Sequence, residues 1–182
     1  MLWLIKGLGP GGAEHLLVNL ASAHDRRRVA LEVAYLLPWK SALVPDLEAA
    51  GVRVHCLDAA DPRRPAWVLR LRRLLATDLY DVVHAHSPLV AGAARLVTRT
   101  IPARRRPAVV TTEHNAWSTL RAPTRLLNGF TAGLDDATIA VSEEARDAMW
   151  PAAVRRSTTV VVHGVAVDRI AAARAHRDET RD

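Results

Sequence analysis

Short apolar runs alternate with helical patterns along almost the whole chain, and this alternation constrains the fold more than any other feature. Val82-Val83, Val109-Val110 and Val160-Val161-Val162 are nearly continuous β-branched runs, as expected for strands buried on both faces. Between such runs, apolar residues recur at helical spacing. Strand–helix alternation indicates a parallel sheet covered by helices on both faces. The sequence therefore predicts an α/β, Rossmann-like fold.

Seven strands are predicted, with helices between most of them. The strands are Leu2–Lys6, Val29–Leu37, Val52–Leu57, Asp81–His86, Ala108–Thr112, Ala137–Val141 and Thr158–Val162. The helices are Ala13–His24, Ser41–Ala50, one from Pro65, one that follows His86 and runs to about Thr100, a longer stretch through Gly133 and a short one from Glu143. From Ala171 onward no bulky apolar residue occurs. We expect one domain over residues 1–170 and a linker or tail over residues 171–182.

The size and cysteine content fit a domain that folds without covalent or metal support. A chain of 182 residues can bury roughly 70% of its unfolded surface. The single cysteine, Cys56, excludes an internal disulfide and is expected to lie in the core. The apolar start Leu2–Ile5 is cut short by Lys6, unlike a signal peptide. We therefore expect a cytoplasmic protein.

The basic charge is carried almost entirely by arginine. The formal net charge is +6, and only two of the 25 basic residues are lysines, so 23 are arginines. An anionic partner and a simple compositional bias both account for such a charge. Because the arginines are dispersed over many elements, the bias is favoured and no nucleic-acid partner is expected.

Polar residues follow several of the predicted strands, at the edge where open parallel sheets bind ligands. The first strand is followed by a glycine run that includes Gly11 and Gly12. Later strands are followed by other candidate site residues, namely His84, His86, Glu113, His114, Asn115 and Ser142.

The glycine run allows close approach of a ligand to the start of a helix, where backbone N–H groups can hold an anion. A tight turn that needs glycine is the alternative. Gly7, Gly9 and Gly12 also satisfy the dinucleotide fingerprint, which requires an acidic residue at the end of the second strand. That strand ends Leu37-Pro38. A nucleotide-dependent oxidoreductase of the Rossmann type is therefore a secondary alternative.

The histidines and the serine each have two interpretations. His84 and His86 alternate in a strand and so point to the same side. With His114 they could contact substrate, hydrogen-bond neighbouring loops or, with little support from their spacing, bind a metal. Ser142 precedes Glu143 and Glu144, so it is first of all a helix N-cap.

Taken together, five segments resemble family 4 glycosyltransferases of the GT-B fold. They are Gly11-Gly12-Ala13-Glu14, Asp81-Val82-Val83-His84-Ala85-His86, Val109–His114, Thr138–Ser142 and Val160–Ile170. They occur in the family's order and cover nearly the whole chain. His163 stands where the family usually has asparagine, and Ile170 where it usually has phenylalanine.

The resemblance implies the N-terminal, acceptor-side half of a retaining glycosyltransferase that needs no metal or cofactor. The donor would be a nucleotide-sugar, and the acceptor a glycan, a lipid or a small molecule. His114 would lie near the reacting centre, and Gly11 and Gly12 near the donor diphosphate and the acceptor. Glu113 and Asn115, which flank His114, would contact substrate, and His86 and Ser142 would line the cleft.

No counterpart of the family's C-terminal, donor-binding domain is found in the 182 residues. We therefore expect this chain alone to be inactive in transfer. A non-catalytic acceptor-binding or truncated module is the main alternative.

Peripheral contact with the inner face of the membrane is a further expectation. It is based on Leu69 with Arg70, Arg72 and Arg73 on one helix face, followed by Arg104–Arg106. A solvated basic face is the alternative.

Overall fold

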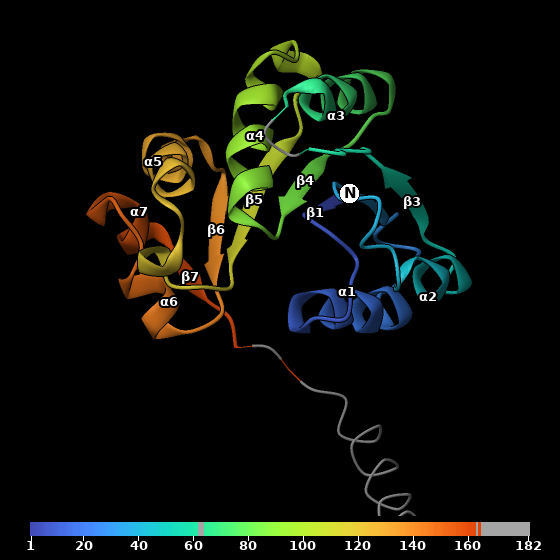
Figure 1. Ribbon diagram of the computed structural model, residues 1–182, viewed down its shortest axis with the longest axis horizontal. Helices are drawn as coiled ribbons and strands as arrows, with labels where there is room; N and C mark the ends of the chain where they lie inside the picture. The colour runs from blue at the N-terminus through green and yellow to red at the C-terminus, as the bar shows by residue number, and fades with distance from the viewer. Residues whose placement is uncertain (62–63, 163, 165–182) are drawn as a thin grey trace, which may run out of the picture.

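The computed structural model of the protein describes residues 1–61, 64–162 and 164. Its centre is a parallel sheet of seven strands in the order β3-β2-β1-β4-β5-β6-β7 (Figure 1). The strands are β1 (Leu2–Ile5), β2 (Glu32–Tyr35), β3 (Arg53–Cys56), β4 (Val82–Ala85), β5 (Ala108–Glu113), β6 (Ala137–Ala140) and β7 (Thr159–Val160). The predicted seven-stranded α/β sheet is confirmed.

Helices cover both faces of the sheet. The α-helices are α1 (Gly12–Ala23), α2 (Val44–Ala49), α3 (Ala66–Thr77), α4 (Pro88–Arg99), α5 (Ala122–Thr131), α6 (Glu143–Asp147) and α7 (Ala152–Ser157). Short 3-10 turns are η1 (Ala103–Arg105), η2 (Trp117–Thr119) and η3 (Ala132–Leu134). In Figure 1, α1 and α2 lie on one side of the sheet, and α3, α4 and α5 on the other.

Strand β1 lies at the centre and divides the core into two layers. Leu2 and Leu4 pack in the cluster that includes the apolar residues of α3 and α4. Trp3 and Ile5 pack on the opposite face with residues of α1 and α2. Because successive side chains of a strand point to opposite faces, one short apolar strand supplies both cores. This explains why all four residues of β1 are buried.

Three sequence predictions need correction. The stretch predicted as one long helix through Gly133 divides into η2, α5 and η3, since Pro123 lies in the first turn of α5 and favours a new helix start. Helix α7 was not predicted. Cys56 is exposed rather than in the core, because β3 is an edge strand.

The predicted basic surface on α3 is partly accounted for by hydrogen bonds within the fold. Arg70 donates to the carbonyl of Leu57 at 2.8 Å, and Arg72 donates to the Thr100 hydroxyl at 3.2 Å. Arg105 and Arg106 also donate to backbone carbonyls. These hydrogen bonds connect α3 and the segment around η1 to neighbouring parts of the fold. Membrane contact stays a prediction.

No helix in the described ranges has the length and apolar character that a bilayer crossing would require.

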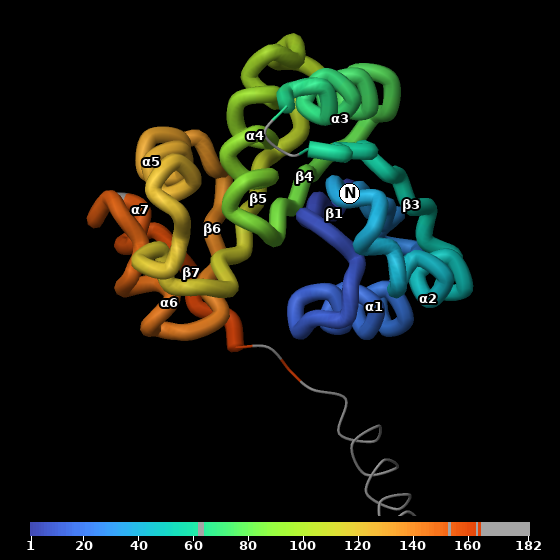
Figure 2. The backbone as a smooth tube through the Cα atoms, viewed as in Figure 1, coloured from blue at the N-terminus to red at the C-terminus, as the bar shows by residue number. Residues whose placement is uncertain are grey.

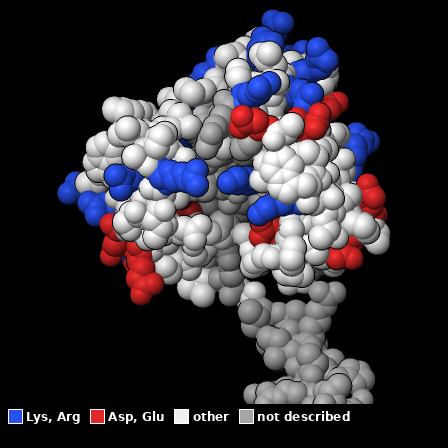
Figure 3. All heavy atoms as spheres, viewed as in Figure 1, with Lys and Arg blue, Asp and Glu red and all other residues white. Residues whose placement is uncertain are grey.

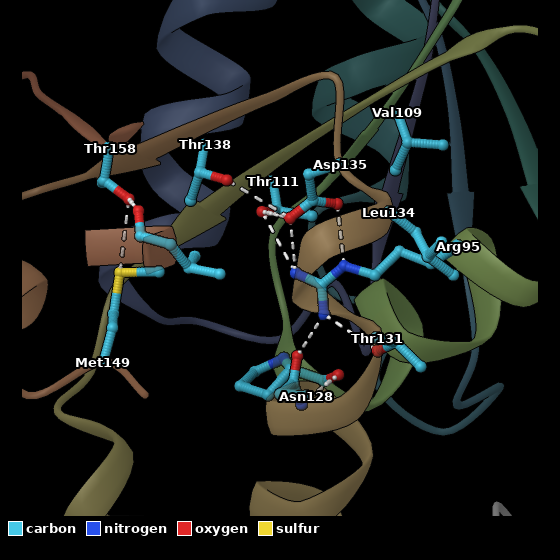
Figure 4. Close-up of polar contacts among 12 residues, drawn as sticks. Arg95, Val109, Thr111, Asn128, Thr131, Leu134, Asp135, Thr138, Met149 and Thr158 are labelled. Atoms are coloured by element: carbon cyan, nitrogen blue, oxygen red, sulfur yellow. Dashed lines mark hydrogen bonds and ion pairs between the residues drawn. The ribbon is translucent and has the colours of Figure 1, made fainter. Parts of the chain in front are cut away.

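A buried arginine joins α4 to the second half of the sheet (Figure 4). Arg95 is 0% exposed and donates from Nε and Nη2 to the two carboxylate oxygens of Asp135, both at 2.7 Å. Its remaining donors reach Asn128 and Thr131 on α5 and Thr111 on β5. The bidentate pair and the added hydrogen bonds compensate the desolvation of a fully buried guanidinium.

Removing one partner of this pair should destabilise the domain strongly. We expect Asp135→Ala to lower the free energy of unfolding by about 3–5 kcal/mol, because Arg95 would remain buried without its counter-charge. The measurement is urea unfolding followed by circular dichroism, with Asp136→Ala as the neighbouring comparison. A loss below about 1 kcal/mol would show that the pair contributes no more than an exposed one.

Candidate functional site

The strand order brings the predicted site segments to one edge of the sheet. The loops after β1, β4, β5 and β6 follow adjacent strands. Two hydrogen bonds link the first of them: the His86 N–H donates to the Leu4 carbonyl at 2.9 Å, and the Lys6 N–H donates to the Ser87 hydroxyl at 3.2 Å. Figure 2 shows the chain path, with α1 and α6 on opposite sides of these strand ends. The edge is thus a continuous row of four loops.

Three aromatic side chains from β1, β4 and the residue that follows β4 stack on the α1 face of the sheet. The ring centroids of His84 and His86 are 4.1 Å apart, and those of Trp3 and His86 are also 4.1 Å apart. This confirms that the two histidines point to the same side. Sequence reasoning missed Trp3; its only signal was a tryptophan within the apolar first strand, which is equally typical of a core residue.

His86 and His114 are joined directly across the edge. His86 Nδ1 lies 3.2 Å from His114 Nε2, at hydrogen-bond distance. His86 is buried, whereas His114 is half-buried. The contact restricts the orientation of the His114 ring, and His114 is the more accessible member of the pair.

His84 has a structural contact within the sheet. Its Nε2 atom forms a 2.8 Å hydrogen bond with the hydroxyl of Thr112 on β5. Burial, together with the nearby His114, lowers the pKa of His84 to about 4. The ring is therefore neutral near pH 7 and links β4 to β5 as a hydrogen-bonding group.

Consecutive residues along β5 point to opposite faces of the sheet. The predicted site residues Glu113 and His114, at the end of this strand, therefore lie on different faces. His114 lies with the histidines, whereas Glu113 is buried at 2% exposure on the side of α4 and α5. Burial raises the pKa of Glu113 to about 6, although the charge of Arg95 opposes the shift. The indole N–H of Trp117 also opposes it, without the geometry of a full hydrogen bond. Asn115 is exposed in the loop.

Close packing explains part of the glycine content of the loop after β1, whereas a left-handed backbone explains none of it. Among the described glycines, only Gly51 has a positive φ. A Cβ at Gly7 would lie 2.8 Å from the Lys40 Cβ, so this glycine is needed for close packing. A Cβ at Gly11 would meet the Glu14 carboxylate, which is the end of a flexible side chain and can turn away, whereas a Cβ at Gly12 would meet no atom within 4 Å. Packing within the described fold therefore does not explain why residue 12 is a glycine.

Ser142 is the N-cap of α6, as its sequence context predicted. Its hydroxyl accepts a hydrogen bond from the Ala145 N–H at 3.1 Å, and Glu143 and Glu144 occupy the first turn. The hydroxyl has this structural role whether or not it also lines a cleft, which stays a prediction.

The described residues do not support a metal site or a dinucleotide-binding site at the carboxyl edge of the sheet. Within the ranges that the structure describes, no group of three His, Cys, Asp or Glu side chains is arranged to hold a metal ion. The residues after β2, Leu36 and Leu37, are buried and apolar. The acidic residue that a dinucleotide-binding site uses for ribose is therefore missing at this position.

Comparisons with known proteins agree with the fold. The model of Glycosyltransferase Family 4 matches residues 10–169. The fold is similar to that of HepE from Anabaena solved with UDP, with a TM-score of 0.71 and 18% identity over 92% of this chain. The HepE structure with UDP and glucose gives the same TM-score and identity. The apo form of the lipopolysaccharide outer core galactosyltransferase WaaB gives a TM-score of 0.66 at 12% identity, over 90% of this chain.

The matched region of these structures is less than half of each. This chain covers 44% and 45% of the two HepE chains and 45% of WaaB. No curated protein shows significant sequence similarity to the chain.

Acidification should weaken the fold through His84. Its pKa is depressed from 6.5 to about 4, so between these values the unfolded chain binds a proton that the folded chain excludes. The contribution of the neutral His84 ring to the free energy of unfolding is therefore complete above pH 6.5 and is lost as the pH falls toward 4. Between pH 7 and pH 5 this amounts to about 2 kcal/mol. We expect His84→Gln to remove that part of the loss, measured by urea unfolding at both pH values; an unchanged pH dependence would contradict the assignment.

Proposed function

This chain belongs to glycosyltransferase family 4, and on that premise we propose that it is the acceptor-side half of a retaining glycosyltransferase. The enzyme transfers a sugar, of the hexose type, from a nucleotide-sugar to a glycan, a lipid or a small molecule. The fold supports this assignment, since it is similar to that of HepE and WaaB. Its likeness to less than half of each relative supports a second, donor-binding domain as the partner of this one.

The observation that carries the proposal is the His86–His114 pair at the carboxyl edge. Open parallel sheets bind ligands at this edge, and the 3.2 Å contact between the two rings orients His114 there. In the proposed complex, His114 contacts the reacting sugar. His86 supports the His114 ring from β4, and Asn115 extends the same loop toward substrate.

Gly11 and Gly12 are assigned to the donor diphosphate and the acceptor. Gly11 is the N-cap of α1 and carries no side-chain cap, so backbone N–H groups at this helix start suit an anion. The open space at Gly12 leaves room for close approach. The Glu14 carboxylate lies against Gly11, so a bound diphosphate requires this side chain to turn away. The side chain of Lys40, packed against Gly7, supplies compensating positive charge.

Glu113 and Ser142 are assigned to the same cleft in different roles. Burial of Glu113 behind β5 makes it a supporting residue for the His114 loop rather than a direct ligand. Ser142 marks the far wall of the cleft through α6. We place the enzyme in the cytoplasm, where nucleotide-sugars are available, with acceptor access at the inner face of the membrane.

Sugar transfer should require the donor half. With a compatible donor domain supplied as a separate chain, we expect transfer that the 182-residue chain lacks by itself, and His114→Ala should reduce this rate at least tenfold. Radiolabelled sugar incorporation measures both. Restored transfer that is indifferent to His114 would refute its role, whereas acceptor binding without transfer under any pairing would favour the non-catalytic module.

Gly12 offers a separate test of the loop. Gly12→Val should leave the fold intact, since a Cβ there meets no atom, yet it should block approach to the start of α1 and abolish pyrophosphate binding. Binding by the unmodified chain should be weak, roughly millimolar, and detectable by NMR chemical shifts. Gly133→Val is the matched control, because its Cβ would also meet no atom within 4 Å. Retained binding in folded Gly12→Val would contradict the assignment.

A further inference from the structure

A second feature of the carboxyl edge lies on the opposite face of the sheet from the histidines. A cavity of about 540 Å³ opens between the end of β1, the start of α4 and the turn that leads into α5. Alternation along β1 places Lys6 on the same side as Leu2 and Leu4, which face α3 and α4. The His84–His86 stack lies on the α1 side. The cavity is therefore separate from the histidine pair, although both are reached from the same edge.

The cavity is positively charged. Lys6 comes from the end of β1, Arg121 from the turn before α5, and no described residue that lines the cavity is acidic. Within the described residues, neither cation forms an ion pair. Figure 3 shows a hollow in this face of the molecule with basic side chains on both of its walls. Two unneutralised cations on facing elements attract an anionic group between them.

Hydrogen-bond donors and the start of a helix add to this charge. Ser87 and Thr124 contribute hydroxyls to the lining. Ser87 is also the N-cap of the 12-residue helix α4, and its side chain does not cap the helix because it accepts from the Lys6 N–H instead. Pro88 has no N–H group, so among the described residues that line the cavity, the first turn of α4 offers the N–H of Leu89. Lysine, arginine and hydroxyl donors around one space match the oxygens of a phosphate.

The remaining lining of the cavity is apolar, and it continues outward along α5. Leu89 and Leu120 line the cavity beside the cations, and Pro123 stands at its rim. Pro123, Leu126 and Phe130 follow one another at helical spacing along one face of α5. Leu126 is 49% exposed and Phe130 is 79% exposed.

Trp150 extends this apolar row. It is 50% exposed and packs edge-on against Phe130, with ring centroids 6.3 Å apart. A Cβ at Gly129 would collide with the Trp150 ring, so this glycine allows the tryptophan to lie close to α5. A contiguous row of exposed large apolar side chains that starts at a charged cavity is typical of a binding surface.

We propose that the cavity binds the phosphate of an amphipathic acceptor whose apolar chain lies along Pro123, Leu126 and Phe130. This rests on the proposed function and deepens it, because it names the acceptor class: a phosphate-bearing molecule with a hydrocarbon portion. Lys6 and Arg121 bind the phosphate. The α5 row then distinguishes a lipid phosphate from a free sugar phosphate or inorganic phosphate, which would use the cations alone.

Direct binding to the 182-residue chain tests this without any transfer reaction. The probes are octyl phosphate below its micellar concentration, octyl glucoside as the neutral molecule with the same chain, and inorganic phosphate as the anion without one. We expect octyl phosphate to bind at least tenfold more tightly than either. Its affinity should fall with added salt, as expected for an exposed charge contact.

Single substitutions locate the site. Lys6→Gln and Arg121→Gln should each weaken octyl phosphate binding roughly tenfold by removing a charge-assisted contact. Phe130→Ser should weaken octyl phosphate but leave inorganic phosphate unchanged. The matched controls are Arg125→Gln, an exposed arginine of α5 outside the cavity lining, and Leu79→Ser, an exposed leucine away from α5. Both should stay within about twofold of the unmodified chain.

The outcomes are distinct. Equal binding of octyl phosphate and inorganic phosphate would overturn the apolar part of the proposal. Equal binding of octyl glucoside, or no effect of Lys6→Gln and Arg121→Gln, would overturn the phosphate site. Because the readout is affinity, a failure here leaves the transferase proposal intact if paired halves still transfer sugar. Specific octyl phosphate binding without transfer would instead preserve the site and count against the transferase.

Discussion

The buried ion pair between Arg95 and Asp135 connects the parts of the fold that carry the candidate site. It joins α4 to the segment that enters β6, and its other hydrogen bonds reach β5 and α5. A guanidinium at 0% exposure is tolerated only with nearly all its donors satisfied. The ends of β5 and β6 carry His114 and Ser142, and α5 carries the apolar row. Their relative positions therefore depend on one polar cluster inside the second half of the sheet.

Side chains alternate between the two faces along each strand, and this alternation determines which functional groups lie together at the carboxyl edge of the sheet. Along β5 and the residue that follows it, Thr112 and His114 face His84 and His86, whereas Thr111 and Glu113 face Arg95 and the helices. In β1, Trp3 stacks on His86, whereas Lys6 belongs to the α4 side. The same edge therefore presents two surfaces of different character: aromatic and imidazole groups on one face, and cations with hydroxyls on the other.

These two surfaces fit the proposed acceptor-side domain, in which this edge would form one wall of a larger cleft. A histidine pair near the start of α1 suits contacts with a sugar, and a basic cavity beside α4 suits a phosphate. The histidine stack is held by buried groups, since Trp3 and His86 are both buried, whereas Lys6 and Arg121 of the cavity are exposed. In the proposed enzyme, a second domain across this edge would supply the opposite wall of the cleft.

Much of the fold followed from sequence, because alternating apolar runs and helical patterns are local signals. The strands around Val83, Val109 and Ile139, the Ser142 cap and the shared side of His84 and His86 all rest on spacing of a few residues. Three features were decided only by tertiary structure. Cys56 is exposed because β3 became an edge strand, and Glu113 is buried because β5 packs against Arg95. The Lys6–Arg121 cavity joins residues over a hundred positions apart. Local spacing specifies which way a side chain points along its own strand, but only the packing of distant elements determines what it meets there.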